Sequence, residues 1–336
     1  MPSVHAVNSM AAMHLLDYSD AAELKAVPTR NGFGEGLIEA GNRNRNVLAM
    51  CADLSESTRM EGFKKAHREQ YIEIGVAEQL LVAMAAGLAS AGKIPFIASY
   101  AMFNPGRSWE QVRTTMALNE TNVKIAGAHA GVSVGPDGAT HQAIEDIAIM
   151  RVIPNMTVVV PCDAVQTKKA TLCVAERWGP TYLRFGREKS VIITTEETPF
   201  EIGKAQIFRG GDDVAIIACG ILVYNALLAA KELAEGDGIE CTVVNNHTIK
   251  PMDEPAIISA AQLCGCVVTV EEHQVHGGMG SRVAEILAQR HPVPVEFVGV
   301  RDQFGQSGDP AELIEFYGMG VKAIKDAVRT AYKRKR

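Results

Sequence analysis

Short apolar runs rich in β-branched residues alternate with segments of helical periodicity along most of the chain. The first half contains five such runs, at 46–53, 95–100, 123–130, 156–161 and 181–185. Helical patterns accompany them at 34–40, 76–90, 108–118, 144–150 and 164–176. Continuous apolar strands separated by helices indicate a parallel sheet that is covered on both faces.

A second series of the same kind follows a polar stretch at 187–203. Its strands are expected at 213–220, 240–246, 266–273 and 294–300, and its helices at 224–234, 255–261, 281–289, 310–316 and 320–332. We therefore predict an α/β fold with two domains, at 25–190 and 203–336, each built on a mostly parallel, helix-covered sheet. Residues 1–24 are expected to form a loosely specified N-terminal arm.

Composition and charge exclude several classes of protein. The 336 residues are 47% hydrophobic and carry a formal net charge of −6, without a broad basic field for nucleic acid. The apolar run at 80–92 is too short to span a membrane, and no secretory signal pattern opens the chain. Seven cysteines, scattered through apolar runs, favour reduced thiols in a cytoplasmic protein. Cys264 and Cys266 are interpreted as a buried structural pair.

Polar residues gather where the first-domain strands end. In open α/β sheets, functional residues lie at the carboxyl ends of strands, which selects the loops at 51–57, 99–107, 127–142 and 184–187. The loop at 127–142 holds four glycines, which let a backbone approach a ligand. It also holds His129, Asp137 and His141, which can bind hydroxyls or carry protons. Read singly, Asp137 and Gly138 could equally form a turn.

One carboxylate interrupts an otherwise apolar helix start. Glu78 lies in "YIEIGVAEQLLVAMAAGLA" at 71–89. It could be a proton-sharing acid in a desolvated site or an acid that answers the helix macrodipole. Spacing alone leaves both interpretations open.

These motifs carry a resemblance to a known family. "IEIGVAEQLLVAMAAGLA", followed by "GVSVGPDGATHQAIEDIAIMRVIPNMTVVVPCD", resembles the transketolases, and the similarity runs from residue 29 to the C-terminus. It implies a pyrimidine-binding domain followed by a transketolase C-terminal domain. It also implies transfer of a two-carbon ketol unit between sugar phosphates, by default pentose phosphates, with thiamin diphosphate as cofactor. Glu78 matches the acid that shares a proton with the coenzyme's pyrimidine ring.

The resemblance assigns further residues one position at a time. The implied catalytic residues are Glu78, His129 and His141. The implied cofactor-binding residues are Asp53, Ser55, Glu78, Tyr100 and Phe103. The implied substrate-binding residues are Arg30, Ser57, Asp137, His141, Arg184 and Arg187, whose guanidinium groups suit a phosphate. The family's third aromatic residue falls near Gly106, and Arg107 or Trp109 is expected to compensate.

The family's diphosphate and metal motif is not found at its usual spacing. Thiamin enzymes carry G-D-G followed by N-N some 25 to 30 residues later in the family pattern, whereas "GDG" at 236–238 and "NN" at 245–246 are far closer together. We interpret the former as a turn. No metal site is therefore predicted in this chain, and Mg²⁺ or a similar ion is expected on a separate N-terminal transketolase subunit. The implied assembly is α2β2, with thiamin diphosphate shared between the subunits.

Other interpretations remain at this point. The β subunit of a 2-oxoacid dehydrogenase has a similar helix start, and a deoxyxylulose phosphate synthase-like fragment or a non-catalytic scaffold paralogue also fits. In the C-terminal domain, Gly277, Gly278 and Gly280 precede a helix and resemble an anion-binding loop, although a structural role is favoured. His273 and His276 are then expected at an interface or in solvent.

Overall fold

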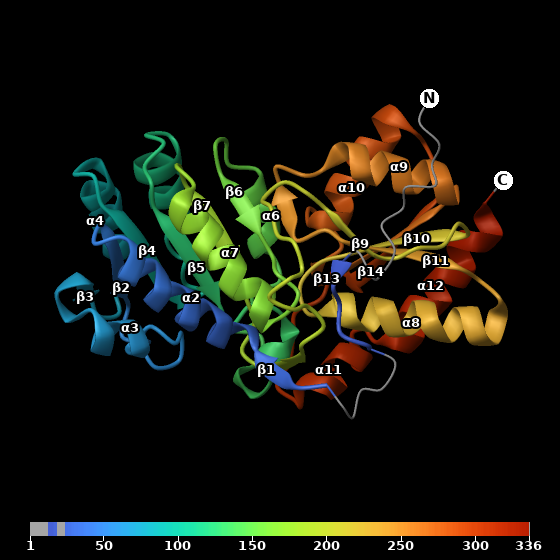
Figure 1. Ribbon diagram of the computed structural model, residues 1–336, viewed down its shortest axis with the longest axis horizontal. Helices are drawn as coiled ribbons and strands as arrows, with labels where there is room; N and C mark the ends of the chain where they lie inside the picture. The colour runs from blue at the N-terminus through green and yellow to red at the C-terminus, as the bar shows by residue number, and fades with distance from the viewer. Residues whose placement is uncertain (1–12, 19–23, 336) are drawn as a thin grey trace.

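The computed structural model describes residues 13–18 and 24–335, so most of the predicted arm at 1–24 lies outside the described residues. Two sheets, each flanked by helices, lie side by side (Figure 1). This arrangement confirms the predicted α/β fold with mostly parallel, helix-covered sheets. None of the helices among these residues is long and apolar enough to cross a membrane.

The first sheet has seven strands in the order β12-β6-β7-β5-β4-β2-β3. Its strands are β2 (Val47–Cys51), β3 (Tyr71–Glu73), β4 (Ile94–Tyr100), β5 (Lys124–Ala128), β6 (Thr157–Val159), β7 (Thr181–Arg184) and β12 (Thr248–Lys250). All neighbours are parallel except β12 and β6. Because β3 and β4 leave β2 on opposite sides, the strand order reverses there, and this switch point is where α/β sheets bind ligands.

Helices cover both faces of this sheet. One face carries α2 (Thr29–Arg43), α3 (Glu61–Ala66) and α7 (Ala164–Glu176); the other carries α4 (Glu78–Ser90), α5 (Trp109–Gln111), the π-helical η2 (Val112–Ala117) and α6 (Asp146–Arg151). Successive side chains of a strand point to opposite faces. Accordingly, Phe96 and Ala98 pack with α2, whereas Ile97 between them packs with α4.

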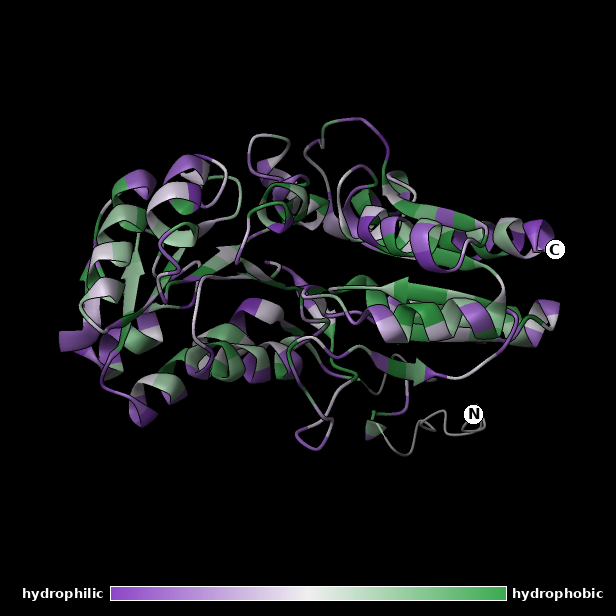
Figure 2. Ribbon diagram, turned by 90° about the horizontal axis from the view of Figure 1, so that it is seen from above, coloured by the Kyte–Doolittle hydropathy of each residue, from purple (hydrophilic) through white to green (hydrophobic). Residues whose placement is uncertain are grey.

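The second sheet has the order β14-β13-β10-β11-β9, with β9 antiparallel to β11. Its strands are β9 (Gln206–Arg209), β10 (Val214–Ala218), β11 (Cys241–Asn245), β13 (Val267–Gln274) and β14 (Val295–Val300). Its helices are α8 (Leu222–Asp237), α9 (Glu254–Cys264), α10 (Met279–Arg290), α11 (Pro310–Phe316) and α12 (Val321–Arg334). Apolar strands lie between helices whose outer turns are hydrophilic (Figure 2).

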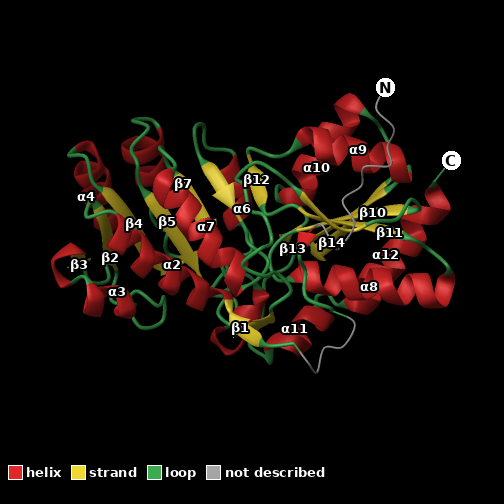
Figure 3. Ribbon diagram, viewed as in Figure 1, coloured by secondary structure: helices red, strands yellow, loops and turns green. Residues whose placement is uncertain are grey.

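The two domains share structure rather than being joined by a simple linker. One continuous apolar cluster contains Ile147 and Met150 of α6 together with Ile257 of α9 and Val283 of α10. Strand β12 leaves the second half of the chain and extends the first sheet, next to α6 at the junction (Figure 3). The polar stretch at 187–203 also contains regular structure, because β8 (Lys189–Val191) pairs with β1 (Ala26–Pro28).

Two sequence motifs of the second domain have structural uses. Gly238 of the "GDG" stretch ends α8 in the left-handed conformation, with φ of 67°, which confirms the predicted turn. Asp237 beside it pairs with Arg329 at 2.7 Å. Cys264 and Cys266 are both buried, and burial raises the pKa of each thiol to about 11.

Candidate active site

The predicted site residues gather at the carboxyl ends of β2, β4 and β5, around the switch point. Asp53 follows β2, Tyr100 ends β4 and His129 follows β5. The register places Tyr100 opposite Ala128, so the end of β4 lies directly beside the start of the loop at 129–142. Both Asp53 and His129 adopt positive φ, at 57° and 56°, which turns the chain sharply at the sheet edge.

Aromatic rings and histidines form a stacked group in this cluster. The rings of Tyr100 and His129 are nearly parallel, with centroids 4.0 Å apart. Phe103 lies 6.4 Å from Tyr100, and the His141 ring meets Phe103 edge-on at 5.3 Å. The structure therefore brings together four of the predicted residues, from two loops, as one continuous surface.

Glu78 is the first residue of α4 and its side chain is only 2% exposed. Its Oε1 accepts a hydrogen bond from Ser99 Oγ at 3.3 Å, and its Oε2 accepts one from Arg107 Nη1 at 3.1 Å. A buried carboxylate needs such partners, because an isolated charge is costly away from water. The position at a helix N-terminus also favours a negative charge, as one of the two interpretations requires. The proton-sharing role stays a prediction.

The turn after β4 leaves no room for an aromatic side chain at the third aromatic position of the family pattern. A side chain at Gly106 would bring its Cβ within 1.9 Å of the carbonyl oxygen of Met102, so no ring can be carried there. Arg107 instead places its guanidinium 5.1 Å from the centre of the Phe103 ring. Trp109 is turned away, since its Nε1 donates to the carbonyl of Ile149. Of the two expected substitutes, only Arg107 therefore borders the cluster.

His129 is a buried, neutral imidazole. Burial, followed by the charge of Arg30, lowers its pKa to about 3. Arg30 Nη1 lies 3.5 Å from His129 Nε2. Because a guanidinium can only donate, Nε2 is the acceptor and the proton sits on Nδ1. That Nδ1–H is buried and has no partner among the described residues, so it is available to an acceptor atom of a ligand.

Cationic side chains surround His129. Burial and the nearby charges of Arg59 and Arg187 lower the pKa of Arg30, and its Nε is a second buried donor without a partner among the described residues. Arg30 Nη1 also donates to the carbonyl of Ser57 at 2.9 Å. Arg187 is held by Asp137 at 3.4 Å and by the carbonyl of Val134 at 3.1 Å. Mutual repulsion in such a group is relieved by a bound anion.

The loop after β2 is anchored by a residue that the sequence did not single out. Glu73 at the end of β3 accepts the backbone N–H of Asp53 at 2.8 Å and the Tyr71 hydroxyl at 2.5 Å. Asp53 is exposed, and Ser55 and Ser57 are partly exposed in the same loop. Glu73 thus fixes the start of this loop at Asp53, and the carbonyl of Ser57 meets Arg30 further along it.

Arg184 does not have the predicted role in phosphate binding. Its side chain is 6% exposed, and Nε pairs with Asp146 Oδ2 at 2.7 Å, with Asp146 only 1% exposed. Its Nη2 donates to the carbonyls of Ala143 and Glu272 at 3.4 and 2.8 Å. Because these bonds occupy the guanidinium between the domains, it is not available to a sugar phosphate.

The glycine-rich loop before α10 is likewise occupied by the protein itself. The backbone N–H groups of Met279 and Gly280 donate to the Glu271 carboxylate at 2.7 and 2.8 Å. The anion expected at this helix N-terminus is therefore a buried side chain, which confirms the favoured structural role. His273 is fully buried between the domains and accepts the N–H of Ala148 at 3.3 Å, whereas His276 is exposed.

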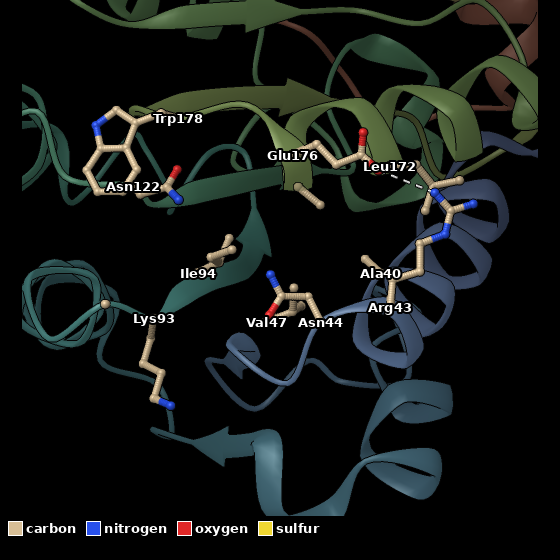
Figure 4. Close-up of a pocket in the computed structure, with 12 residues that line it drawn as sticks. Ala40, Arg43, Asn44, Val47, Lys93, Ile94, Asn122, Leu172, Glu176 and Trp178 are labelled. Atoms are coloured by element: carbon tan, nitrogen blue, oxygen red, sulfur yellow. Dashed lines mark hydrogen bonds and ion pairs between the residues drawn. The ribbon is translucent and has the colours of Figure 1, made fainter.

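A cavity lies at the amino ends of strands β2 and β4 of the first sheet (Figure 4). It is bordered by Val47 and Ile94, the first residues of β2 and β4, and by the pair Arg43–Glu176 at 3.4 Å. Because the predicted residues meet at the other ends of these strands, this cavity is separate from the cluster. Within 13–18 and 24–335, no group of three or more His, Cys, Asp or Glu side chains forms a metal site.

Sequence reasoning missed several residues of the site. Arg59 contributes positive charge beside Arg30, and Ser99 bonds Glu78 from the strand one step before Tyr100. Arg59 lies two residues beyond the selected loop at 51–57, so its charge near that loop was a usable signal. Ser99 had no such signal, because a serine within an apolar strand gives no indication of its hydrogen-bond partner.

The fold defines a two-domain α/β protein. Its switch point combines an acid, stacked rings and arginines, and such a site suits ligands that carry phosphate and hydroxyl groups. Residues 25–191 match the model described as "Transketolase, pyrimidine binding domain", and 203–324 match "Transketolase, C-terminal domain". The chain belongs to the transketolase family.

Several similar proteins are themselves named as C-terminal sections or subunits. A Methanocaldococcus jannaschii protein named "Putative transketolase C-terminal section" is 44% identical over 308 residues, covering 91% of this chain and 96% of that protein. A 6-deoxy-6-sulfo-D-fructose transketolase subunit of Clostridium sp. (strain MSTE9) is 41% identical, covering 91% and 95%. A solved structure titled "Split gene transketolase, inactive beta4 tetramer" matches with a TM-score of 0.87 and 44% identity, covering 92% of this chain and 100% of that one.

Proposed function

We propose that this chain is the C-terminal subunit of a split transketolase, which transfers a two-carbon ketol unit between sugar phosphates together with a separate diphosphate-binding subunit. The observation that carries the proposal is the cluster itself. A buried acid, two stacked rings, an uncharged histidine and three arginines meet at one switch point. The seven cysteines, all free of disulfides, fit a cytoplasmic protein.

The cluster fits the aminopyrimidine end of thiamin diphosphate, on which the transketolase family depends in general. Glu78 offers a carboxylate that can share a proton with a ring nitrogen, and Tyr100 and Phe103 offer apolar faces beside it. Asp53 and Ser55 are proposed to line the same side. When bound, the coenzyme supplies the electron sink for breaking a carbon–carbon bond next to a ketone. No divalent ion is assigned to this chain; the partner is proposed to hold it.

The remaining residues are proposed to act on the sugar phosphate. His129 presents an uncharged N–H to a substrate oxygen, and His141, within the same stacked group, exchanges a proton there. Asp137 accepts a hydrogen bond from a substrate hydroxyl. Arg30 and Arg187, with the Ser57 hydroxyl, bind the phosphate, because guanidinium forks match its geometry. Arg59 adds positive charge to the same place.

An exposed apolar stripe on α4 supports a partner at this site. Leu80 and Met84 of α4 are 51% and 38% exposed and four residues apart, so they lie on one side of the helix. Val76, 71% exposed, precedes the helix. Leu118, 72% exposed, directly follows the neighbouring η2. Contiguous exposed apolar surface marks protein interfaces. A diphosphate-binding subunit docked here would meet the coenzyme beside Glu78, in the proposed α2β2 assembly.

The proposed function is tested by reconstitution. The chain alone is expected to show no ketol transfer, and activity is expected to appear when the product of a neighbouring reading frame with properly spaced G-D-G and N-N motifs is added with thiamin diphosphate and Mg²⁺. Turnover is measured with xylulose 5-phosphate and ribose 5-phosphate, and with other sugar phosphates in parallel, because one relative is named for a sulfo-sugar. Full activity from this chain alone would contradict the split arrangement.

Replacing Arg187 by methionine is expected to raise KM for a phosphorylated acceptor by about 10- to 100-fold, because a charged hydrogen bond to phosphate is lost. KM for an unphosphorylated acceptor such as glycolaldehyde should change by less than about threefold. Arg209→Met provides a matched control, since that arginine pairs with Glu240 in the other domain. Equal losses with both acceptors would contradict a phosphate contact at Arg187.

A further inference from the structure

The loop at 129–142, which carries His129, Asp137 and His141, is fixed largely by the other domain. Gln142 Nε2 donates to the carbonyls of Val132 and Gly135 within the loop, at 3.0 and 3.2 Å, and to the carbonyl of Gln306 at 3.0 Å. A Cβ at Gly135 would lie 2.9 Å from Pro310, so α11 touches the loop directly. Figure 1 shows α11 and β13 at the junction of the domains.

One side chain of β13 reaches into this loop. Glu272 is 4% exposed, and its Oε1 accepts the backbone N–H of Ser133 at 2.6 Å. The approach is so close that a Cβ at Gly131 would lie 2.2 Å from the Glu272 carboxyl carbon. Gly131 has φ of 89°, which only glycine adopts readily. The loop and the carboxylate thus fit each other at two positions, Gly131 and Ser133.

Glu272 is itself held in place by the buried network between the domains. Its backbone carbonyl accepts from Arg184 Nη2 at 2.8 Å, and Arg184 is paired with Asp146 at 2.7 Å. Burial raises the pKa of the Glu272 carboxyl, which shows how little solvent reaches it. A group so enclosed does not touch substrate, and its carboxylate accepts a hydrogen bond from the loop through the N–H of Ser133 while facing the charge of Arg184.

We propose that Glu272 is a positioning residue for the substrate site, acting through the backbone N–H of Ser133 to fix the loop that carries His129, Asp137 and His141. The C-terminal domain then takes part in sugar recognition as well as in packing. This inference rests on the proposed function, because it assumes that the loop binds substrate. A displacement of about 1 Å in such a group can cost on the order of 10²-fold.

Glu271 supplies a matched control. It is the adjacent glutamate, 1% exposed, and it also accepts backbone N–H groups, but those of Met279 and Gly280 at the start of α10. Glu272→Ala in the reconstituted complex is expected to raise KM for ribose 5-phosphate by about 10- to 100-fold with a smaller fall in kcat. Glu271→Ala should lower the melting temperature comparably and leave KM within about threefold.

A conservative variant separates positioning from folding. Glu272→Gln retains an acceptor oxygen and should restore KM to within about threefold, whereas Glu272→Asp withdraws the carboxylate by one methylene and should not. Calorimetric binding of ribose 5-phosphate to the complex should follow the same order. Equal KM values for the two alanine variants, or for Gln and Asp, would overturn the inference. Absence of ketol transfer in the wild-type complex would instead overturn the proposed function.

Discussion

Glu78→Gln is expected to lower ketol transfer by the reconstituted complex about 10²- to 10⁴-fold, the usual contribution of a positioned acid–base group. The amide keeps the size of the side chain and can still accept from Ser99 Oγ or Arg107 Nη1, which lie at 3.3 and 3.1 Å. It cannot share a proton with the coenzyme ring. Initial rates with saturating thiamin diphosphate, together with coenzyme affinity by calorimetry, measure the effect.

Glu69→Gln is the control for this variant. Glu69 is an exposed glutamate nine residues earlier, and its substitution removes the same charge from the surface. Both variants should sediment as the same complex with the partner. A Glu78→Gln complex that retains full activity would contradict the proposed role of Glu78 as a proton-sharing acid. It would also favour a scaffold role, in which partner binding alone is the function.

The alternation of apolar strands and helices was sufficient to predict most of both sheets. Runs such as Val214–Ala218 are buried at every position, and such runs occur in parallel sheets with helices on both faces. The strand β12 was not predicted, because three residues with one polar end carry no periodic signal. Its pairing with β6 depends on how the two domains meet, which is a tertiary property.

The site shows the same division between local and tertiary information. Residues placed by strand ends, such as Tyr100 and His129, meet as the sequence predicts, because parallel strands end at one edge. In the sequence, Arg184 and Arg187 look alike, except that Arg184 is the last residue of β7 and Arg187 lies beyond it. Its partner Asp146 lies 38 residues away, so no local pattern distinguishes a buried ion pair from a phosphate ligand.

That ion pair leads to the second large effect. Asp146→Ala is expected to lower the free energy of unfolding by about 3–5 kcal/mol, because Arg184 would remain buried without its counter-charge. Asp146 Oδ2 accepts from Arg184 Nε at 2.7 Å and from the Tyr182 hydroxyl at 2.6 Å, so both donors lose their acceptor. Urea unfolding of the purified chain, followed by circular dichroism, measures the change.

The partly exposed pair Arg151–Glu285, at 2.6 Å with side chains 13% and 45% exposed, provides the comparison. Glu285→Ala should cost at most about 1 kcal/mol, because water screens that pair. The double variant Asp146→Leu with Arg184→Met should recover most of the loss, since it removes both charges and leaves apolar side chains of similar length. If the double variant is as unstable as Asp146→Ala, the loss reflects altered packing at the domain junction. In that case an uncompensated charge is not its cause.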